Sequence, residues 1–456
     1  MTVANLAALA RGVRLEKTFL DKVRSWLDIF LGTDRGTEEL DPSLLEKAGW
    51  GVIFPRDGDP KIRTALRPLL DWRKSQAAAR DELRYREFWG DDGYRRGESM
   101  YDFLLQHDAE FGTVDPRQMP YYLLLVGSPE EIPFSFQYDL DVLYAVGRLD
   151  LGSPKEYASY AESVIATERA RTPSSTSPLR MAFFCPDNLD EASIRARREL
   201  VGGLTDRFAA APQEAWSLDS VLDDFATPEG LCHLLGGGGT PNFLFTACHG
   251  LVFPSDDPRL RHKQGALLCQ TRGRTTTLKA AVSADEITDR AEVHGLVAFQ
   301  FACFSAGTPG IELGEELEPT KTVVRSEKAF TARLPQRLLG HPNGGALAVI
   351  GHVSRAWTYS FSGFGKAPQL NTFEDTIRRI LRGERVGFAL EHFNLSFASK
   401  AGYLMNLREL ETIAPSNGKR DAQLALAYCI AKDARNYVVL GDPAVSAAPT
   451  HLGPEA

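Results

Sequence analysis

The chain has 456 residues, which is longer than one ordinary compact domain and predicts at least two packed units. Hydrophobic residues make up 43% and charged residues 25%, a composition that excludes an intrinsically disordered chain and a membrane-spanning one. The net charge of -8 provides no basic field that would gather phosphate groups or anionic lipid. We therefore expect neither a nucleic-acid partner nor a membrane partner.

The N-terminal segment, residues 1–47, begins MTVANLAALARGVRLEKTFLDKVRSWLDIFLG and has an amphipathic apolar pattern. No apolar run reaches the length of a signal peptide, because charges interrupt the pattern at Arg11, Arg14 and Glu16. We expect residues 1–47 to form a helical leader and the protein to be cytoplasmic.

The six cysteines are spread thinly over the chain, which is typical of free thiols in a reducing compartment. No two of them form a Cys-x-x-Cys pair. The dipeptides Cys232-His233 and Cys248-His249 lack the second closely spaced pair of a structural zinc site. We expect neither a metal nor an organic cofactor.

Apolar runs of strand length alternate with helical stretches along most of the chain. The expected strands lie in residues 49–59, 121–133, 142–149 and 180–186 and in PNFLFTACHG, GLVAFQFACFSAG, GGALAVIGHV and NYVVLGDP. The expected helices include residues 155–173, residues 191–208 and a helical pair over residues 61–111. This alternation predicts an α/β fold with a mainly parallel sheet covered by helices on both faces.

The expected domains follow from composition along the chain. The stretch at residues 174–177 is typical of a linker, because it is rich in Ser and Thr. We therefore expect a first α/β subdomain over residues 48–176, a second, larger α/β subdomain over residues 177–448 and a tail at residues 449–456.

Two expected strands end in reactive side chains, where parallel strands collect functional residues. The run FLFTA leads into Cys248-His249-Gly250, and the run LVAFQFA leads into Cys303 followed by small residues. A thiol is a useful nucleophile only as thiolate, with an unperturbed pKa of about 8.5, so it needs a neighbour such as His249. Backbone N–H groups at Gly250 and Cys303 are expected to stabilise an oxyanion.

The segments ACHG and FACFSAG resemble the His-Gly and Cys blocks of the cysteine peptidase clan that contains caspases, separases, gingipains and CHAT-domain proteases. LLLVGSPEEIP, VGRLDL, GGALAVIGHVSRAW and NYVVLGDPAV resemble the gingipain branch. The interval from His249 to Cys303 is similar to the roughly 50-residue interval of caspases. The resemblance implies a caspase-hemoglobinase-like fold with two side-by-side subdomains, and a cysteine endopeptidase with Cys303 as nucleophile and His249 as catalytic histidine.

The pocket that would hold the residue before the scissile bond is expected next to Cys303. Caspases have Gln directly before the Ala-Cys dipeptide, whereas here Phe301 occupies that position and Gln300 precedes it. Caspase-like aspartate specificity is therefore not implied. By the resemblance, one wall of the pocket contains Ser354, Arg355 and Trp357.

The charge of this pocket is left open by the sequence. Arg355 would favour an acidic substrate side chain, whereas Asp139 or Asp141 facing the pocket would favour Arg or Lys. Of the two, we favour a basic substrate residue. The alternative is that Arg355 is a surface residue and Asp141 a turn or helix-capping residue. Asp141 or Glu131 is expected to orient His249.

Two residues compete with the Cys303–His249 pair. His352 also leaves an expected strand at its carboxyl end and is the main rival histidine. Cys248 precedes the histidine and is expected to be a buried small residue instead of a second nucleophile. Residues 308–328 mix acidic residues with Gly and Pro, and we expect an exposed loop there.

The expected function is limited proteolysis of protein or peptide substrates, in a bacterial regulatory or defence pathway and with activation by a partner protein. Two alternatives stay open: a peptide ligase or transpeptidase that uses the same dyad, and a latent caspase-like scaffold or interaction module. Because a decayed site usually lacks one member of the dyad, the presence of both Cys303 and His249 favours catalysis.

Overall fold

The structure is a computed structural model that describes residues 40–109, 114–170, 178–210, 216–270, 278–313, 322–362, 367–413 and 418–448. Residues 1–39 of the expected leader, the expected linker at 174–177 and the expected tail at 449–456 lie outside the described residues. Within the described ranges, no helix combines the length and the apolar composition needed to cross a bilayer.

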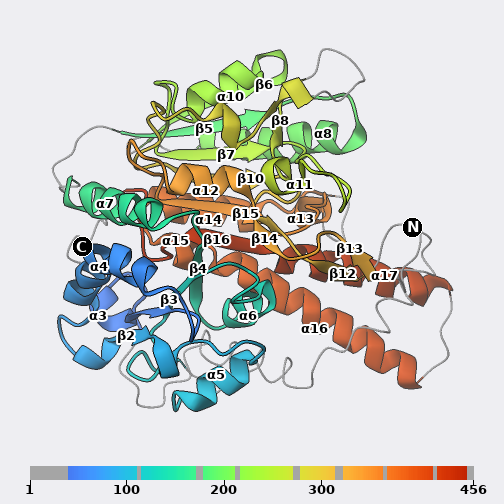
Figure 1. Cartoon of the computed structure of the whole chain (residues 1–456). Helices are drawn as coiled ribbons and strands as arrows, with labels where there is room; N and C mark the ends of the chain where they lie inside the picture. The colour runs from blue at the N-terminus through green and yellow to red at the C-terminus, as the bar shows by residue number, and fades with distance from the viewer. Residues whose placement is uncertain are drawn as a thin grey trace.

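A ten-stranded sheet forms the centre of the molecule (Figure 1). In spatial order its strands are β2 (Tyr85–Phe88), β1 (Trp50–Ile53), β3 (Tyr122–Val126), β4 (Ala145–Leu149), β16 (Tyr437–Gly441), β15 (Ala348–His352), β10 (Val297–Phe301), β7 (Phe243–Ala247), β5 (Leu179–Cys185) and β6 (Trp216–Leu222). All neighbours pair in parallel except β15 and β16, which are antiparallel. The sheet therefore consists of two parallel sets whose carboxyl ends lie on opposite edges.

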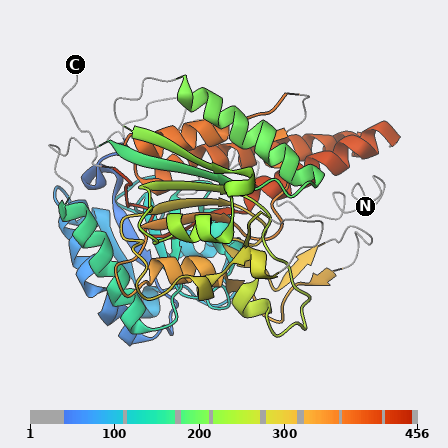
Figure 2. The same ribbon diagram turned by 90° about the horizontal axis from the view of Figure 1, so that it is seen from above.

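Helices cover both faces of this sheet, so the predicted fold class is confirmed (Figure 2). On one face, Phe373 of α14 and Phe393 of α16 pack against Phe299 of β10. On the other face lies α7, whose Tyr160 hydroxyl donates a 2.8 Å hydrogen bond to the carbonyl of Leu347. These contacts fix the helical layers on the central strands of the sheet.

The described helices and the smaller β-ribbons connect the strands of the sheet. The helices are α3 (Leu45–Ala48), α4 (Pro60–Ala77), α5 (Met100–Gln106), α6 (Phe134–Leu140), α7 (Pro154–Ala170), α8 (Glu191–Arg195), α9 (Gly203–Ala209), α10 (Pro228–Leu234), α11 (Leu260–Lys263), α12 (Arg333–Leu339), α13 (Tyr359–Ser362), α14 (Asn371–Leu381), α15 (Val386–Ala389), α16 (Glu391–Ile413) and α17 (Gly418–Arg435). The ribbons pair β8 (Leu267–Leu268) with β9 (Ala281–Val282), β11 (Gly307–Thr308) with β14 (Phe330–Thr331), and β12 (Ile311–Leu313) with β13 (Thr322–Val324).

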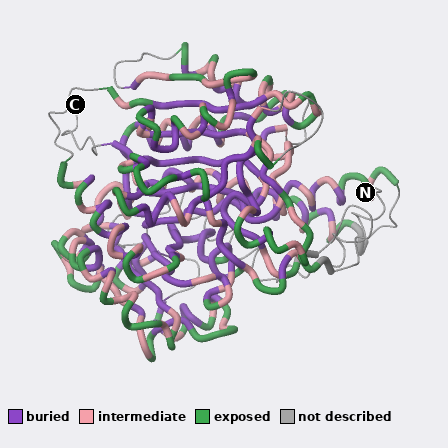
Figure 3. Tube along the Cα trace, turned by 45° about the horizontal axis from the view of Figure 1, so that its top comes forward, coloured by how far each residue is buried: buried purple, intermediate pink, exposed green. Residues whose placement is uncertain are grey.

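Buried residues concentrate in the central strands, while exposed residues lie on outer helices and turns (Figure 3). Every residue of β3, β7, β10, β15 and β16 is buried, which explains their continuous apolar sequences. The edge strand β2 is only partly buried. The expected helical pair over residues 61–111 is accordingly wrong in its middle, because Tyr85–Phe88 leaves the helical pattern to pair with β1.

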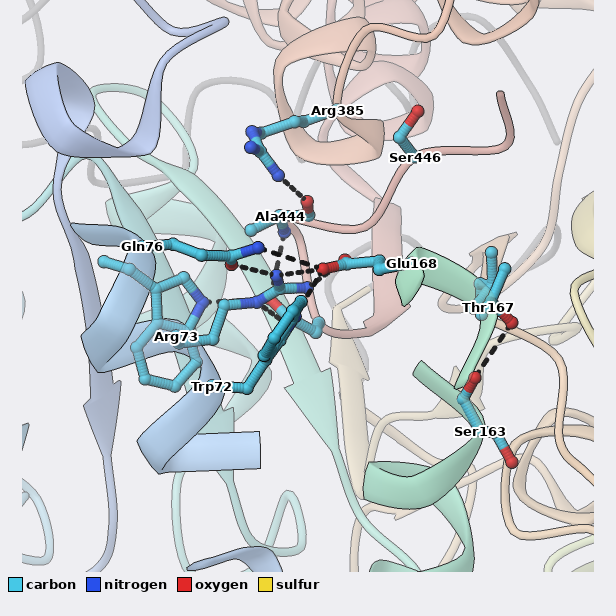
Figure 4. A network of polar contacts seen from close by, with 12 residues as sticks. Trp72, Arg73, Gln76, Ser163, Thr167, Glu168, Arg385, Ala444 and Ser446 are labelled. Carbon is cyan, nitrogen blue, oxygen red and sulfur yellow. Dashed lines mark hydrogen bonds and ion pairs between the residues drawn. The ribbon is translucent and has the colours of Figure 1, made fainter. Parts of the chain in front are cut away.

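A buried ionic cluster around Arg73 lies between α4, α7 and the turn after β16 (Figure 4). Arg73 Nε donates to Asp442 Oδ2 and its Nη2 donates to Glu168 Oε1, each at 2.6 Å. Asp442 Oδ1 also accepts a 3.0 Å hydrogen bond from the Trp50 indole. Burial alone would raise the pKa of Glu168, but the Arg73 charge and its hydrogen bonds outweigh burial and lower that pKa from 4.5 to about 2. The cluster therefore joins β1, α4, α7 and the turn after β16.

Substituting Arg73→Met is expected to lower the free energy of unfolding by about 3–5 kcal/mol, because the two buried carboxylates then lose the cation that is hydrogen-bonded to both of them. The folded-state pKa of Glu168 is depressed, so the stabilisation is present above pH 4.5 and is lost as the pH falls toward 2. Chemical denaturation of both proteins between pH 7 and pH 3 measures this. A difference below about 1 kcal/mol at pH 7, or one that grows on acidification, would contradict the assignment.

Candidate active site

Three adjacent parallel strands bring the candidate residues to one edge of the sheet. The strands β5, β7 and β10 are neighbours, with Phe184 opposite Thr246 and Ala247 opposite Phe301. Asp190 lies in the turn after β5, His249 follows β7 and Cys303 follows β10. Because the strands are parallel and in register, all three residues leave the sheet at the same carboxyl edge.

His249 is oriented by Asp190, whose Oδ2 lies 2.9 Å from His249 Nε2. The other oxygen of Asp190 accepts hydrogen bonds from the backbone N–H groups of Ala192 and Ser193 and so caps α8. Partial burial alone would raise the pKa of Asp190, but the hydrogen bonds from Ser193 and His249 outweigh burial and lower it. An ionised Asp190 holds the proton on Nε2, which leaves the lone pair on Nδ1 for proton exchange.

Cys303 lies partly buried at the end of β10, with its Sγ 3.6 Å from the carbonyl oxygen of Ala356. Burial raises the pKa of the thiol, while hydrogen bonding to the Gly250 backbone and the charge of Arg355 act in the opposite direction. A Cβ atom at Gly250 would lie 1.9 Å from the carbonyl oxygen of Cys303. Only glycine permits this approach, which brings the Gly250 backbone against the backbone of Cys303.

The backbone after Cys303 makes a strained turn. Phe304 has φ of 57°, and its N–H donates a 2.6 Å hydrogen bond to the carbonyl of Ser354, which has φ of 92°. On its other side, a Cβ atom at Gly265 would lie 2.2 Å from the Phe304 carbonyl oxygen. Left-handed conformations at non-glycine residues are costly and persist only where neighbours fix them. The turn is therefore held between Ser354 and Gly265.

A pocket of about 400 Å³ opens beside His249 and Cys303. The first turn of α8 forms one wall, and residues 356–359 form another, with the rings of Trp357 and Tyr359 6.4 Å apart. Glu191 lies at this pocket and is exposed. Arg195 also lines it, but its guanidinium is 2.9 Å from Glu199. The pocket thus combines aromatic faces with a carboxylate, and its cation is already paired.

Asp433 of α17 holds the pocket wall at residues 356–359 in place through hydrogen bonds. Its Oδ1 accepts a 2.8 Å hydrogen bond from the Trp357 N–H, and its Oδ2 accepts a hydrogen bond from the Ser360 hydroxyl. His352 Nε2 lies 3.5 Å from the same carboxylate. Asp433 is almost fully buried, at 1% exposure, so this anchor is shielded from solvent.

Several expected pocket residues occupy other roles. Trp357 lines this pocket, whereas Ser354 holds the Phe304 backbone. Arg355 does not line the pocket, although its charge favours the Cys303 thiolate. Gln300 is buried in β10 and does not line the pocket, and within the described chain its side-chain amide has no hydrogen-bond partner.

The three carboxylates that were expected near His249 or the pocket, all within residues 131–141, lie elsewhere in the fold. Asp139 is exposed on α6, and Glu131 accepts hydrogen bonds from Ser128. Asp141 ends α6 before β4, where burial raises its pKa well above the usual range. Strands β16 and β15 separate β4 from β10, so Asp190, and neither Asp141 nor Glu131, is the carboxylate at His249.

His352 and Cys248 are accounted for by packing. His352 is buried at the end of β15, and its ring nitrogens lie 3.0 Å from the Asp433 carbonyl and 3.2 Å from the Ser354 carbonyl. Cys248 lines the pocket, but burial raises its pKa well above that of a free thiol. Across the described ranges, no group of three or more His, Cys, Asp or Glu residues is arranged to hold a metal ion.

Replacing Asp190 by Asn is expected to slow alkylation of Cys303 by iodoacetamide at neutral pH by at least about tenfold. Asn retains the helix cap but removes the charge and favours the wrong imidazole tautomer. The matched control is Asp187→Asn, because Asp187 bonds to the backbone of its own turn. Rates are measured by intact mass. Equal alkylation rates for Asp190→Asn and Asp187→Asn would show that Asp190 does not assist the reaction of Cys303.

Comparisons with known proteins identify similar folds only among solved structures. No family model and no curated protein matches the chain. A structure described as a protease is 14% identical with a TM-score of 0.48, over 88% of this chain and 78% of that chain. The Arg-specific cysteine proteinase gingipain R is 13% identical with a TM-score of 0.47, over 90% of this chain and 80% of that chain.

A Saccharomyces cerevisiae separase in complex with securin is also similar, at 13% identity and a TM-score of 0.36. That match covers 71% of this chain and 15% of the separase chain. The resemblance to gingipain and separase predicted from the sequence is thus also found among solved structures, as a similarity of fold.

Proposed function

We propose that this chain is a cysteine endopeptidase in which Cys303 is the nucleophile, His249 the general base and Asp190 the residue that orients the histidine. The supporting observation is that β5, β7 and β10 deliver Asp190, His249 and Cys303 to one edge, where the last two line the same pocket. Nucleophile, base and orienting group in this order form the arrangement used for acyl transfer by thiols.

The proposed reaction begins with transfer of the Cys303 proton to Nδ1 of His249, because Nε2 is engaged by Asp190. The resting thiol is protonated, since burial raises its pKa, so the imidazole is needed to form the thiolate. The thiolate attacks the peptide carbonyl, and backbone N–H groups of Gly250 and Cys303 stabilise the oxyanion. The imidazolium then protonates the leaving amine, and water hydrolyses the thioester.

The pocket favours a basic residue before the scissile bond. Glu191 provides a carboxylate at the pocket, and Trp357 and Tyr359 provide aromatic faces that attract a cation. The positive charge of Arg195 is balanced by Glu199. The lining of the pocket therefore favours Arg or Lys over Asp, with limited cleavage of protein targets as the corresponding activity.

Cys303→Ala and His249→Ala are each expected to lower kcat/KM for peptide hydrolysis by at least about 10³-fold, because the two groups act as a unit. Cys248→Ala is the matched control and is expected to retain activity, since its thiol serves packing. Mass spectrometry of products from a peptide mixture measures the rates. Cleavage by Cys303→Ala would contradict the proposal, and spliced peptides as the main product would identify a ligase instead.

Glu191→Gln is expected to lower kcat/KM for Arg-containing substrates by about tenfold and to leave neutral substrates unchanged, because one charge at a partly solvated pocket is removed. The control is Glu292→Gln, an exposed carboxylate before the amino end of β10. Paired substrates that differ only at the residue before the cleaved bond supply the readout. Faster cleavage after Asp than after Arg by the wild-type chain would overturn the basic preference.

A further inference from the structure

A second hollow, separate from the candidate active site, lies between α6, α16 and α17. Its volume is about 380 Å³. Its apolar lining includes Phe134, Tyr138, Phe397, Ala401 and Leu404. Figure 1 shows α16 and α17 running side by side out from the central sheet, with α6 and the β12–β13 ribbon beside them. We call this hollow the helical groove.

Apolar side chains extend the helical groove onto the surface. Ile311 lines the groove and is 65% exposed. Its cross-strand partner in the β12–β13 ribbon is Val324, which is 54% exposed. Opposed residues of an antiparallel pair lie on the same face, so the two side chains form one continuous apolar patch. A hollow joined to an exposed apolar patch is typical of a protein interaction site.

The charge of the helical groove is of one sign. Among the described residues that line it, the charged side chains are Lys432 and Arg435, both on α17, and none is acidic. Arg435 is held over the ring of Tyr138 at 5.1 Å. The whole chain, by contrast, has 60 acidic and 52 basic residues. The complementary occupant is therefore apolar and acidic.

The helical groove is connected to the candidate active site by short hydrogen-bonded paths. Ser354 lines the groove, and its carbonyl accepts the hydrogen bond from the N–H of Phe304, the residue after Cys303. The end of α17 also lines the groove, and Asp433 in the same turn holds the Trp357 N–H. Asn436, another lining residue, accepts a 2.8 Å hydrogen bond from the Val353 N–H.

We propose that the helical groove docks an acidic, apolar polypeptide segment of a partner protein, and that docking changes the reactivity of Cys303. The groove between two helices suits a segment that inserts successive apolar side chains, while its carboxylates meet Lys432 and Arg435. The docked segment contacts Ser354 and the end of α17. These two features hold the turn at Phe304 and the pocket wall at Trp357. The consequence for proteolysis rests on the proposed function, but docking and the thiol response do not.

The probe is a displayed library of random peptides of about twelve residues, selected on the full chain carrying Cys303→Ala so that no probe is cleaved. Recovered peptides are expected to combine apolar residues with Asp or Glu. Synthetic copies are expected to bind the charge reversal Lys432→Glu/Arg435→Glu at least about tenfold more weakly, because attraction becomes repulsion. Ile311→Ser, at an exposed site, tests the apolar contact separately. The matched control is Lys61→Glu/Arg80→Glu, a reversal of equal size on exposed residues away from the groove.

Coupling is measured on the otherwise unsubstituted chain as the rate of Cys303 alkylation by iodoacetamide with and without the peptide. A change of at least about fivefold that disappears in Lys432→Glu/Arg435→Glu is expected. Recovery of only basic peptides, equal binding by the groove and control reversals, or an unchanged alkylation rate would overturn the proposal. Binding lost in Trp357→Ala but kept in the groove reversal would assign the peptides to the active-site pocket. A dimer that the groove reversal dissociates would assign the groove to a second copy.

Discussion

The candidate active site depends on the in-register parallel pairing of β5, β7 and β10. These strands are mostly buried, and the turns that follow them carry Asp190, His249 and Cys303, one on each turn. Because the turns lie side by side, small residues must separate them, and Gly250 meets the Cys303 backbone at a distance that no larger residue permits. A shift of one residue in any strand would turn its side chains to the opposite face and separate the three groups.

The antiparallel seam between β15 and β16 has a structural and a functional consequence. It places the carboxyl ends of the two parallel sets of strands on opposite edges of the sheet. It also brings the end of α17, which leads into β16, beside the end of β15. Asp433 thereby supports the pocket wall from a helix that on its other side lines the helical groove. The ionic cluster at Arg73 anchors the far end of β16.

Much of the sheet and the positions of two candidate-site residues were predictable from the sequence, because strands buried on both faces appear as continuous apolar runs. His249 and Cys303 stand directly after such runs. The edge strand β2 was missed because its half-buried residues lack that signature. Asp190 was missed because a helix-capping aspartate is common, and the spatial order of strands that brings it to His249 depends on tertiary pairing. The same order explains why Asp141 was misassigned.

The most direct test of the Asp190–His249–Cys303 assignment is covalent capture with an acyloxymethyl ketone probe that carries Arg, followed by intact-mass measurement and peptide mapping. The assignment predicts one probe molecule per chain, attached to Cys303, with labelling lost in His249→Ala and slowed in Asp190→Asn. Attachment to Cys248 or another cysteine, or labelling of Cys303 that is unchanged in His249→Ala, would contradict it.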